Sequence, residues 1–213
     1  MSRLESTIDL AVLDPCTKSV DIIKACQLAR EHKMASVCVY PSELLFCNLV
    51  LAKSDVTLST VIGFPFGNQA TDIRCEEAKR AIDDGAQELD VVMRMSCFAD
   101  KLMLAAMLDM HKIVEAADWT PVKVIIETGN WDKNGIVAAS KMARDAGAAY
   151  VKTCTGFGPR GVTVEDIEII KSAVDLPIKA SGGIKTRQQA EIYVDLGCSR
   201  LGIGIGSIEK ILK

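Results

Sequence analysis

Histidine is scarce in this sequence: among 213 residues there are only two, His32 and His111, and both fall within stretches of helical pattern. A zinc site or a Ser/His/Asp triad would have to be assembled almost without imidazole, so both are disfavoured. Any acid–base chemistry then falls to Lys, Asp, Glu, Tyr or a thiol.

Long apolar runs and a surplus of basic residues are also missing. The longest purely apolar stretch, residues 102–108, is far too short to span a bilayer, and residues 1–13 contain no signal-like apolar run. Acidic residues outnumber basic ones by 28 to 25, which gives a formal net charge of -3, whereas nucleic-acid and membrane-surface binding require a basic face. We therefore expect a cytoplasmic protein without nucleic-acid or membrane partners.

Eight cysteines are present, but no two of them are spaced as a CxxC pair. In a chain without an export signal, scattered cysteines are more typical of buried, reduced thiols than of disulfides. Cys38 and Cys154 lie near the ends of strand-like runs, where a reactive thiol is the alternative. We interpret both as small buried residues.

Strand-like runs alternate with helical ones along the whole chain. Most are continuous apolar stretches rich in Val and Ile, as buried parallel strands require. The eight runs are residues 7–10, 35–40, 57–64, 88–93, 122–127, 149–153, 177–180 and 200–203. Possible capping boxes at Thr163 with Asp166 and at Thr186 with Gln189 mark the starts of two helices between them.

Three glycines, Gly85, Gly147 and Gly197, stand where helices must end, each a few residues before a strand-like run. Their separations of 62 and 50 residues fit two β/α units per step, which argues for one closed barrel rather than two domains. An open doubly wound sheet would need a glycine-rich fingerprint after its first strand, and residues 9–17 contain no glycine. We predict an α/β fold, a (β/α)8 TIM barrel, as a single domain over residues 1–213.

Asp90, Lys152 and Lys179 stand in the predicted strands, at whose C-terminal ends such barrels carry their active sites. One such lysine alone is as readily a long side chain that reaches from the barrel mouth to solvent. Lys152 and Lys179 lie on adjacent strands, about 4.8 Å apart, so each disfavours the protonation of the other, and desolvation acts in the same direction. We expect a neutral amine suited to Schiff-base formation, with Asp90 holding a water or relaying a proton.

Several motifs in order resemble those of the deoxyribose-phosphate aldolases. They are Ile8-Asp9-Leu10, Cys38-Val39-Tyr40-Pro41, Gly63-Phe64-Pro65-Phe66-Gly67, Glu88-Leu89-Asp90-Val91-Val92, Lys123 to Gly129, Val151-Lys152-Thr153-Cys154-Thr155-Gly156-Phe157 and Lys179-Ala180-Ser181-Gly182-Gly183-Ile184. The resemblance implies a class I aldolase that reversibly cleaves 2-deoxy-D-ribose 5-phosphate into glyceraldehyde 3-phosphate and acetaldehyde. It also implies that Lys152 forms the imine, that Lys179 shifts its protonation and that Asp90 relays protons, without a metal or an organic cofactor.

Glycines near the ends of the predicted sixth, seventh and eighth strands form the candidate phosphate site. Glycine allows the backbone to approach an anion closely and to point N–H groups at it, although these glycines also suit tight βα turns. The candidates are Gly156, Gly182, Gly183, Gly204, Gly206 and Ser207. Members of the family usually carry serines in a pattern near G-T-S-S here, and this chain has two fewer hydroxyl donors in the run from Gly202 to Gly206. Ser207 is expected to cap the last helix in compensation.

Two further hypotheses remain open beside the deoxyribose-phosphate aldolase. The missing serines allow an imine-forming barrel that acts on another aldehyde or on a non-phosphorylated substrate, and a catalytically silent barrel that serves as an interaction subunit is the third hypothesis. Lys123 and Glu127 share a face of the run 122–127, where an internal ion pair is as good an interpretation as catalysis. The expected partners are small-molecule aldehyde and sugar-phosphate substrates, and the chain is expected to form a homo-oligomer.

Overall fold

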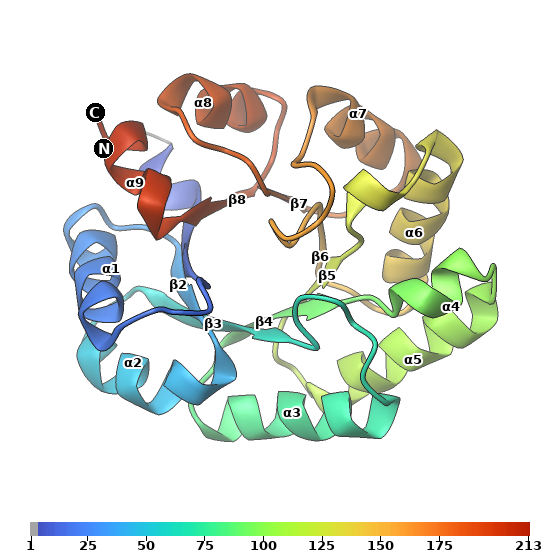
Figure 1. Ribbon diagram of the computed structural model, residues 1–213, viewed down its shortest axis with the longest axis horizontal. Coiled ribbons are helices and arrows are strands. Elements are labelled where there is room, and N and C mark those ends of the chain that lie inside the picture. The colour runs from blue at the N-terminus through green and yellow to red at the C-terminus, as the bar shows by residue number, and fades with distance from the viewer. Residues whose placement is uncertain (1–3) are drawn as a thin grey trace.

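Eight short parallel strands pair in chain order and close on themselves in the computed structural model, which describes residues 4–213 (Figure 1). The strands are β1 Ile8–Val12, β2 Ser36–Val39, β3 Thr57–Ile62, β4 Glu88–Val92, β5 Val122–Ile125, β6 Tyr150–Lys152, β7 Ile178–Ser181 and β8 Arg200–Gly204. The ring closes where Ile8 of β1 aligns with Leu201 of β8. All eight predicted strands are confirmed, as is the TIM-barrel fold; residues 1–3 of the predicted domain lie outside the described residues.

Helices surround the barrel and connect one strand to the next (Figure 1). They are α1 Ser19–Glu31, α2 Leu44–Leu51, α3 Thr71–Asp83, α4 Met95–Ala99, α5 Met103–Ala116, α6 Lys133–Asp145, α7 Val164–Ala173, α8 Arg187–Asp195 and α9 Ile205–Ile211, with 3-10 turns η1 Glu5–Thr7, η2 Pro41–Glu43 and η3 Thr128–Asn130. Within residues 4–213, no helix combines the length and the apolar character needed to cross a membrane.

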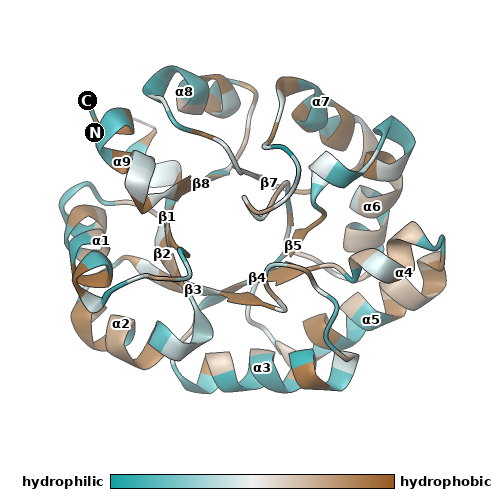
Figure 2. Ribbon diagram, in the orientation of Figure 1, coloured by the Kyte–Doolittle hydropathy of each residue, from teal (hydrophilic) through white to brown (hydrophobic). Residues whose placement is uncertain are grey.

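Side chains alternate along each strand between two environments. In β4, Leu89 and Val91 face outward into the hydrophobic layer beneath the helices, whereas Asp90 lies between them and faces the barrel interior. The same alternation buries Val151 outward and Lys152 inward in β6. Figure 2 shows the brown, hydrophobic residues along the strands, with teal residues spread over the helices. The main apolar core is therefore a shell between strands and helices, and the barrel interior holds the buried charged groups together with a few apolar side chains such as Val61 and Ile125.

The predicted helix ends are confirmed. Gly85, Gly147 and Gly197 follow α3, α6 and α8 with φ angles of 106°, 91° and 89°, a backbone conformation that glycine adopts without steric cost. Capping boxes begin α7 at Thr163 and α8 at Thr186, as predicted. These turns return the chain to the N-terminal end of the barrel, so that each strand delivers its C-terminal end, and the loop after it, to the opposite face, here called the mouth.

The cysteine prediction is correct in part. Cys38 and Cys154 are buried and unpaired, as expected. Cys16, in the loop after β1, is exposed, and Cys75 and Cys97 are only half-buried. Cys16 lies on a loop outside the apolar layer, whereas Cys75 on α3 and Cys97 on α4 pack against the edge of that layer and stay partly exposed.

Candidate active site

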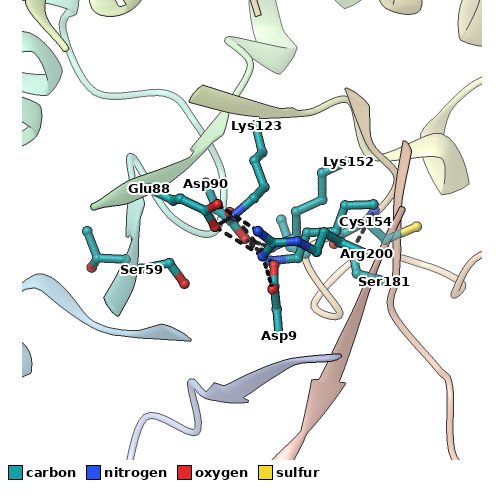
Figure 3. Close-up of polar contacts among 12 residues, drawn as sticks. Asp9, Ser59, Glu88, Asp90, Lys123, Lys152, Cys154, Ser181 and Arg200 are labelled. Carbon is teal, nitrogen blue, oxygen red and sulfur yellow. Dashed lines mark hydrogen bonds and ion pairs between the residues drawn. The ribbon is translucent and has the colours of Figure 1, made fainter. Parts of the chain in front are cut away.

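Three strands bring Asp90, Lys152 and Lys179 to one point inside the barrel (Figure 3). Lys152 and Lys179 are aligned across the β6–β7 pair, and each Nζ lies 2.7 Å from the same oxygen, Oδ2 of Asp90. Both lysine side chains are almost completely buried, with exposed fractions of 4% and 2%. The structure thus brings together the three predicted catalytic residues.

A wider ion-pair network lies around this trio, here called the interior network. Its members are Asp9, Glu88, Asp90, Lys123, Lys152, Lys179 and Arg200. Lys179 Nζ lies 2.6 Å from Oδ2 of Asp9, and Arg200 reaches the other Asp9 oxygen at 2.6 Å. Lys123 Nζ lies 2.5 Å from Glu88 and 3.3 Å from Asp90. Figure 3 shows these side chains converging from strands all around the barrel.

Mutual attraction keeps Asp90 and Lys179 ionised. Burial acts to raise the pKa of Asp90, but the basic side chains of Lys152, Lys179 and Lys123 outweigh it and hold the pKa well below its usual range. For Lys179 the balance is reversed: burial acts to lower its pKa, and the carboxylates of Asp9 and Asp90 raise it above the usual value. Lys179 is therefore a cation at neutral pH, held beside the Lys152 amine.

A pocket of about 570 Å³ opens at the mouth directly above the two lysines. Its walls contain Lys152, Lys179 and all of the predicted phosphate-site residues, which are Gly156, Gly182, Gly183, Gly204, Gly206 and Ser207. Gly182 and Gly183 have φ angles of 90° and 78°, so the loop after β7 depends on glycine. A side chain at Gly204 or Gly206 would meet open space, because no atom lies within 4 Å of either Cβ position.

Ser207 does not cap the last helix, contrary to the prediction. The residue before α9 is Gly204, and Ser207 is the third residue of the helix, inside its first turn and on the pocket wall. A cap at Ser207 would start the helix at Ile208, whereas α9 begins at Ile205, directly after β8.

Ser181, Thr155 and Lys185 are among the pocket residues that the sequence analysis did not assign to the site. Lys185 brings a cation to the pocket beside the Gly182-Gly183 turn. A signal existed for Lys185, since it follows closely after a glycine pair at the end of a predicted strand. Among the described residues, no group of three or more His, Cys, Asp or Glu side chains is arranged to hold a metal ion.

An aromatic chain crosses the mouth beside the pocket. The Phe157 ring, in the loop after β6, packs edge-on against Phe64 after β3, with centroids 5.4 Å apart. Phe64 in turn lies 6.1 Å from the Tyr40 ring, and the Tyr40 hydroxyl donates to the carbonyl of Leu13. Loops after β6, β3, β2 and β1 are joined in this way, and Phe157 gives the pocket an apolar wall.

The Lys123–Glu127 ion pair, one of two interpretations of these residues, does not form. Lys123 instead pairs with Asp9, Glu88 and Asp90 in the interior network. Glu127 has a left-handed backbone, with φ 51°, which takes it out of strand alternation. Its Oε2 accepts hydrogen bonds from the backbone N–H and the hydroxyl of Thr155, so it supports the loop that follows Lys152.

Comparison with known proteins gives consistent results for sequence and structure. The model of the DeoC/LacD family aldolases matches residues 6–199. The chain is 40% identical over 208 residues to a deoxyribose-phosphate aldolase of Treponema denticola, covering 96% of both chains. It is 41% identical over 206 residues to one of Bdellovibrio bacteriovorus, covering 96% of this chain and 94% of the relative.

Solved structures agree with this. A putative deoxyribose-phosphate aldolase from Coccidioides immitis superposes with a TM-score of 0.93 at 32% identity, covering 98% of this chain and 84% of that one. The deoxyribose phosphate aldolase from Aeropyrum pernix, described as a unique tetramer, superposes with a TM-score of 0.89 at 30% identity, covering 98% of this chain and 89% of that one.

Proposed function

We propose, from the premise that the chain belongs to the DeoC/LacD family of aldolases, that it reversibly cleaves 2-deoxy-D-ribose 5-phosphate into glyceraldehyde 3-phosphate and acetaldehyde through an imine on Lys152. One observation carries the proposal: Lys152 lies on the pocket wall with its amine 2.7 Å from Asp90, beside the charged Lys179. Such an amine meets an aldehyde at the floor of the pocket with proton-transfer groups on its inner side.

The reaction follows from this geometry. The Lys152 amine adds to the C1 aldehyde carbon of the open-chain sugar, and loss of water leaves a protonated imine. The C3 hydroxyl then loses its proton, the C2–C3 bond breaks, and its electron pair moves into an enamine that the imine nitrogen stabilises. Glyceraldehyde 3-phosphate leaves, the enamine is protonated at C2, and water releases acetaldehyde and restores the amine. Two protons are moved, one away from O3 and one onto C2.

Asp90 and Lys179 are the groups placed to manage these protons. The carboxylate of Asp90 accepts hydrogen bonds from both lysines, so it holds the Lys152 nitrogen in position while that nitrogen changes its substituents. Lys179, a cation buried next to the reacting nitrogen, can donate a proton to departing water through the pocket. Histidine is not needed for any step.

The phosphate end of the substrate is proposed to bind opposite the aromatic chain. Gly156, Gly182, Gly183, Gly204 and Gly206 line the pocket without side chains that would cover their backbone, and Lys185 adds a positive charge to the lining. Ser207 adds a hydroxyl from the first turn of α9. These groups support phosphate binding without the two serines that the sequence lacks.

A non-phosphorylated aldehyde substrate is the second candidate. It is favoured by the open space at Gly204 and Gly206 and by the apolar wall that Phe157 contributes. A catalytically silent interaction subunit has less support, because a structural role gives no reason to bury Lys152 and Lys179 beneath an open pocket.

Two measurements test the function. Cleavage of deoxyribose 5-phosphate should exceed cleavage of free deoxyribose, and equal rates would favour the second candidate. Treatment with acetaldehyde and borohydride should leave a reduced adduct on Lys152, located by peptide mass. An adduct on Lys179 alone would reverse the two assignments, and the absence of an adduct on either lysine would reject the imine mechanism.

Self-association and a cytoplasmic location complete the proposal. Leu45 and Leu49 on α2 are 57% and 77% exposed, and apolar side chains one helical turn apart suit a subunit interface. The tetrameric Aeropyrum pernix structure supports the same expectation. Free thiols at all eight cysteines suit a reducing compartment. Light scattering tests the first point, and cell fractionation tests the second.

A further inference from the structure

We propose that Arg200 and Glu88, at the closed end of the barrel opposite the mouth, set the pH at which Lys152 becomes a nucleophile by fixing the charge balance of the interior network. The inference rests on the proposed function, since it assumes that the free amine of Lys152 reacts. It assigns a positioning role to two residues that cannot touch the substrate.

The charge count of the network is the first step. Three carboxylates, those of Asp9, Glu88 and Asp90, face four basic groups, those of Lys123, Lys152, Lys179 and Arg200. With every group ionised, the buried network would carry one uncompensated positive charge, which is costly away from water. The charges match when one basic group is neutral.

The contacts identify that group as Lys152. An arginine stays protonated in proteins, which excludes Arg200. Lys123 contacts three carboxylates and Lys179 contacts two. Lys152 contacts only Asp90, and it shares that oxygen with Lys179. The amine with the least compensation gives up its proton first, and it is the one that forms the imine in the proposed mechanism.

The location of the controlling pair is the second step. Glu88 and Arg200 are the first residues of β4 and β8, and Arg200 Nη2 lies 2.8 Å from Glu88 Oε1. Neither residue lines the pocket. Both act on Lys152 through the carboxylates and ammonium groups that lie between, so removal of one charge changes the count without changing the substrate's surroundings.

Other titratable groups near the network do not alter the count. Burial and the nearby Asp90 raise the pKa of the Cys38 thiol on β2, which keeps it neutral. Tyr150 on β6 presents its ring to Lys123, with the centroid 5.9 Å from Nζ. Glu127 is turned toward Thr155, while Asp14, Asp21 and Lys185 lie at the solvent-facing rim of the pocket.

Two substitutions should move the pH profile in opposite directions. Arg200→Met removes one cation, so the three carboxylates are matched only when Lys152 is protonated. The acid limb of the pH–rate profile for cleavage should therefore move to higher pH by about one unit. Glu88→Gln removes a carboxylate, so protonation of Lys152 is further disfavoured, and the acid limb should move to lower pH by a similar amount. The double variant restores the match and should return the limb close to that of the wild type.

Controls separate charge from structure. Arg200→Lys keeps the charge and changes the shape, so it should retain the wild-type profile. The inference would be overturned if the pH–rate profiles of Arg200→Met and Glu88→Gln shifted in the same direction, or if neither shifted. If Arg200→Met fails to fold, the profiles of Glu88→Gln and of the double variant still provide the test. Borohydride trapping of acetaldehyde on wild-type Lys152 is run in parallel. Failure of that trapping rejects the proposed function, whereas trapping with unmoved profiles rejects only the role of the pair.

Discussion

Two buried clusters of charge in this molecule differ in how well their charges match. Between α3 and α5, Arg74 forms an ion pair with Asp109, both side chains are almost fully buried, and the cluster contains one cation and one carboxylate. Thr71 donates to Asp109 at 2.6 Å, and Arg74 donates to the carbonyl of Val92 at 3.0 Å. In the barrel interior, four basic groups face three carboxylates beneath an open pocket.

The difference separates a structural use of buried charge from a chemical one. The matched pair ties α3 and α5 to the end of β4. The interior network holds the Lys152 amine, whose ion-pair partner is Asp90, and that amine lies on the pocket wall. A surplus basic group costs folding energy and supplies a nucleophile.

The largest effect is expected from removal of the surplus amine itself. Lys152→Met should lower the cleavage rate by about four orders of magnitude, because it removes the amine that is proposed to form the imine. The free energy of unfolding should change by about 1 kcal/mol or less, or should rise, since a similar volume is kept and no charge is left unpaired. Kinetics and urea denaturation measure the two quantities. A large loss of stability would show that Lys152 has a structural role and would erase the contrast between the clusters.

The matched pair should show the opposite pattern. Arg74→Met leaves the Asp109 carboxylate buried without its cation, which should lower the free energy of unfolding by about 3–5 kcal/mol. The rate of the folded fraction should stay near that of the wild type. Arg74→Met combined with Asp109→Leu removes both charges and should recover much of the loss. If the single variant unfolds no more easily than the wild type, the pair is not the structural tie that its burial indicates.

A smaller effect is expected at Lys179. Lys179→Leu removes a permanent cation, so the remaining carboxylates favour a protonated Lys152, and the rate at neutral pH should fall about 100-fold. Because deprotonation of Lys152 is then needed, the optimum should move to higher pH. Lys179→Arg keeps the charge and serves as the control. An active Lys179→Leu enzyme with an unchanged pH–rate profile would remove Lys179 from its role.

The smallest effect concerns the mouth, where the substrate brings its own charge. Gly204→Ser with Ile205→Ser adds two hydroxyl donors, and the Cβ position of Gly204 has space for one of them. Hydrogen bonds to a charged group contribute about 1.5–3 kcal/mol each, so partial success should lower KM for deoxyribose 5-phosphate about tenfold. KM for free deoxyribose should barely change. If KM changes for neither substrate, backbone N–H groups and Lys185 already satisfy the hydrogen-bonding capacity of the phosphate.

Strand alternation explains why the sequence alone predicted the catalytic trio. Asp90, Lys152 and Lys179 are polar residues within apolar strands, and an adjacent pair of parallel strands must bring the two lysines together. The role of Glu88 was also accessible, because it lies two residues before Asp90 and shares its face. The contact between Asp9 and Arg200 could not be predicted from the sequence, because it depends on which residues align when β1 pairs with β8.

Local backbone conformation accounts for the errors. Glu127 was assigned to the face of Lys123 by counting along an extended strand, but β5 ends at Ile125 and Glu127 is left-handed. Ser207 was assigned as a cap in place of the missing serines, but the chain enters α9 directly from β8, so Ser207 lies inside the first turn. A two-residue periodicity is reliable inside a strand and fails where the strand ends, which is where a barrel carries its site.

The contact between Asp9 and Arg200 joins residues 191 positions apart and exists only because the barrel is closed. A half-barrel or an open sheet can align Lys152 with Lys179, but it leaves the first and last strands apart. Asp9 and Arg200 then cannot pair, and the interior network lacks that contact. The closing contact has the largest loop-closure cost in the network, so it forms only with the complete ring. In the proposed mechanism the reactivity of Lys152 therefore depends on the whole ring, and borohydride trapping during refolding should begin only once the barrel has closed.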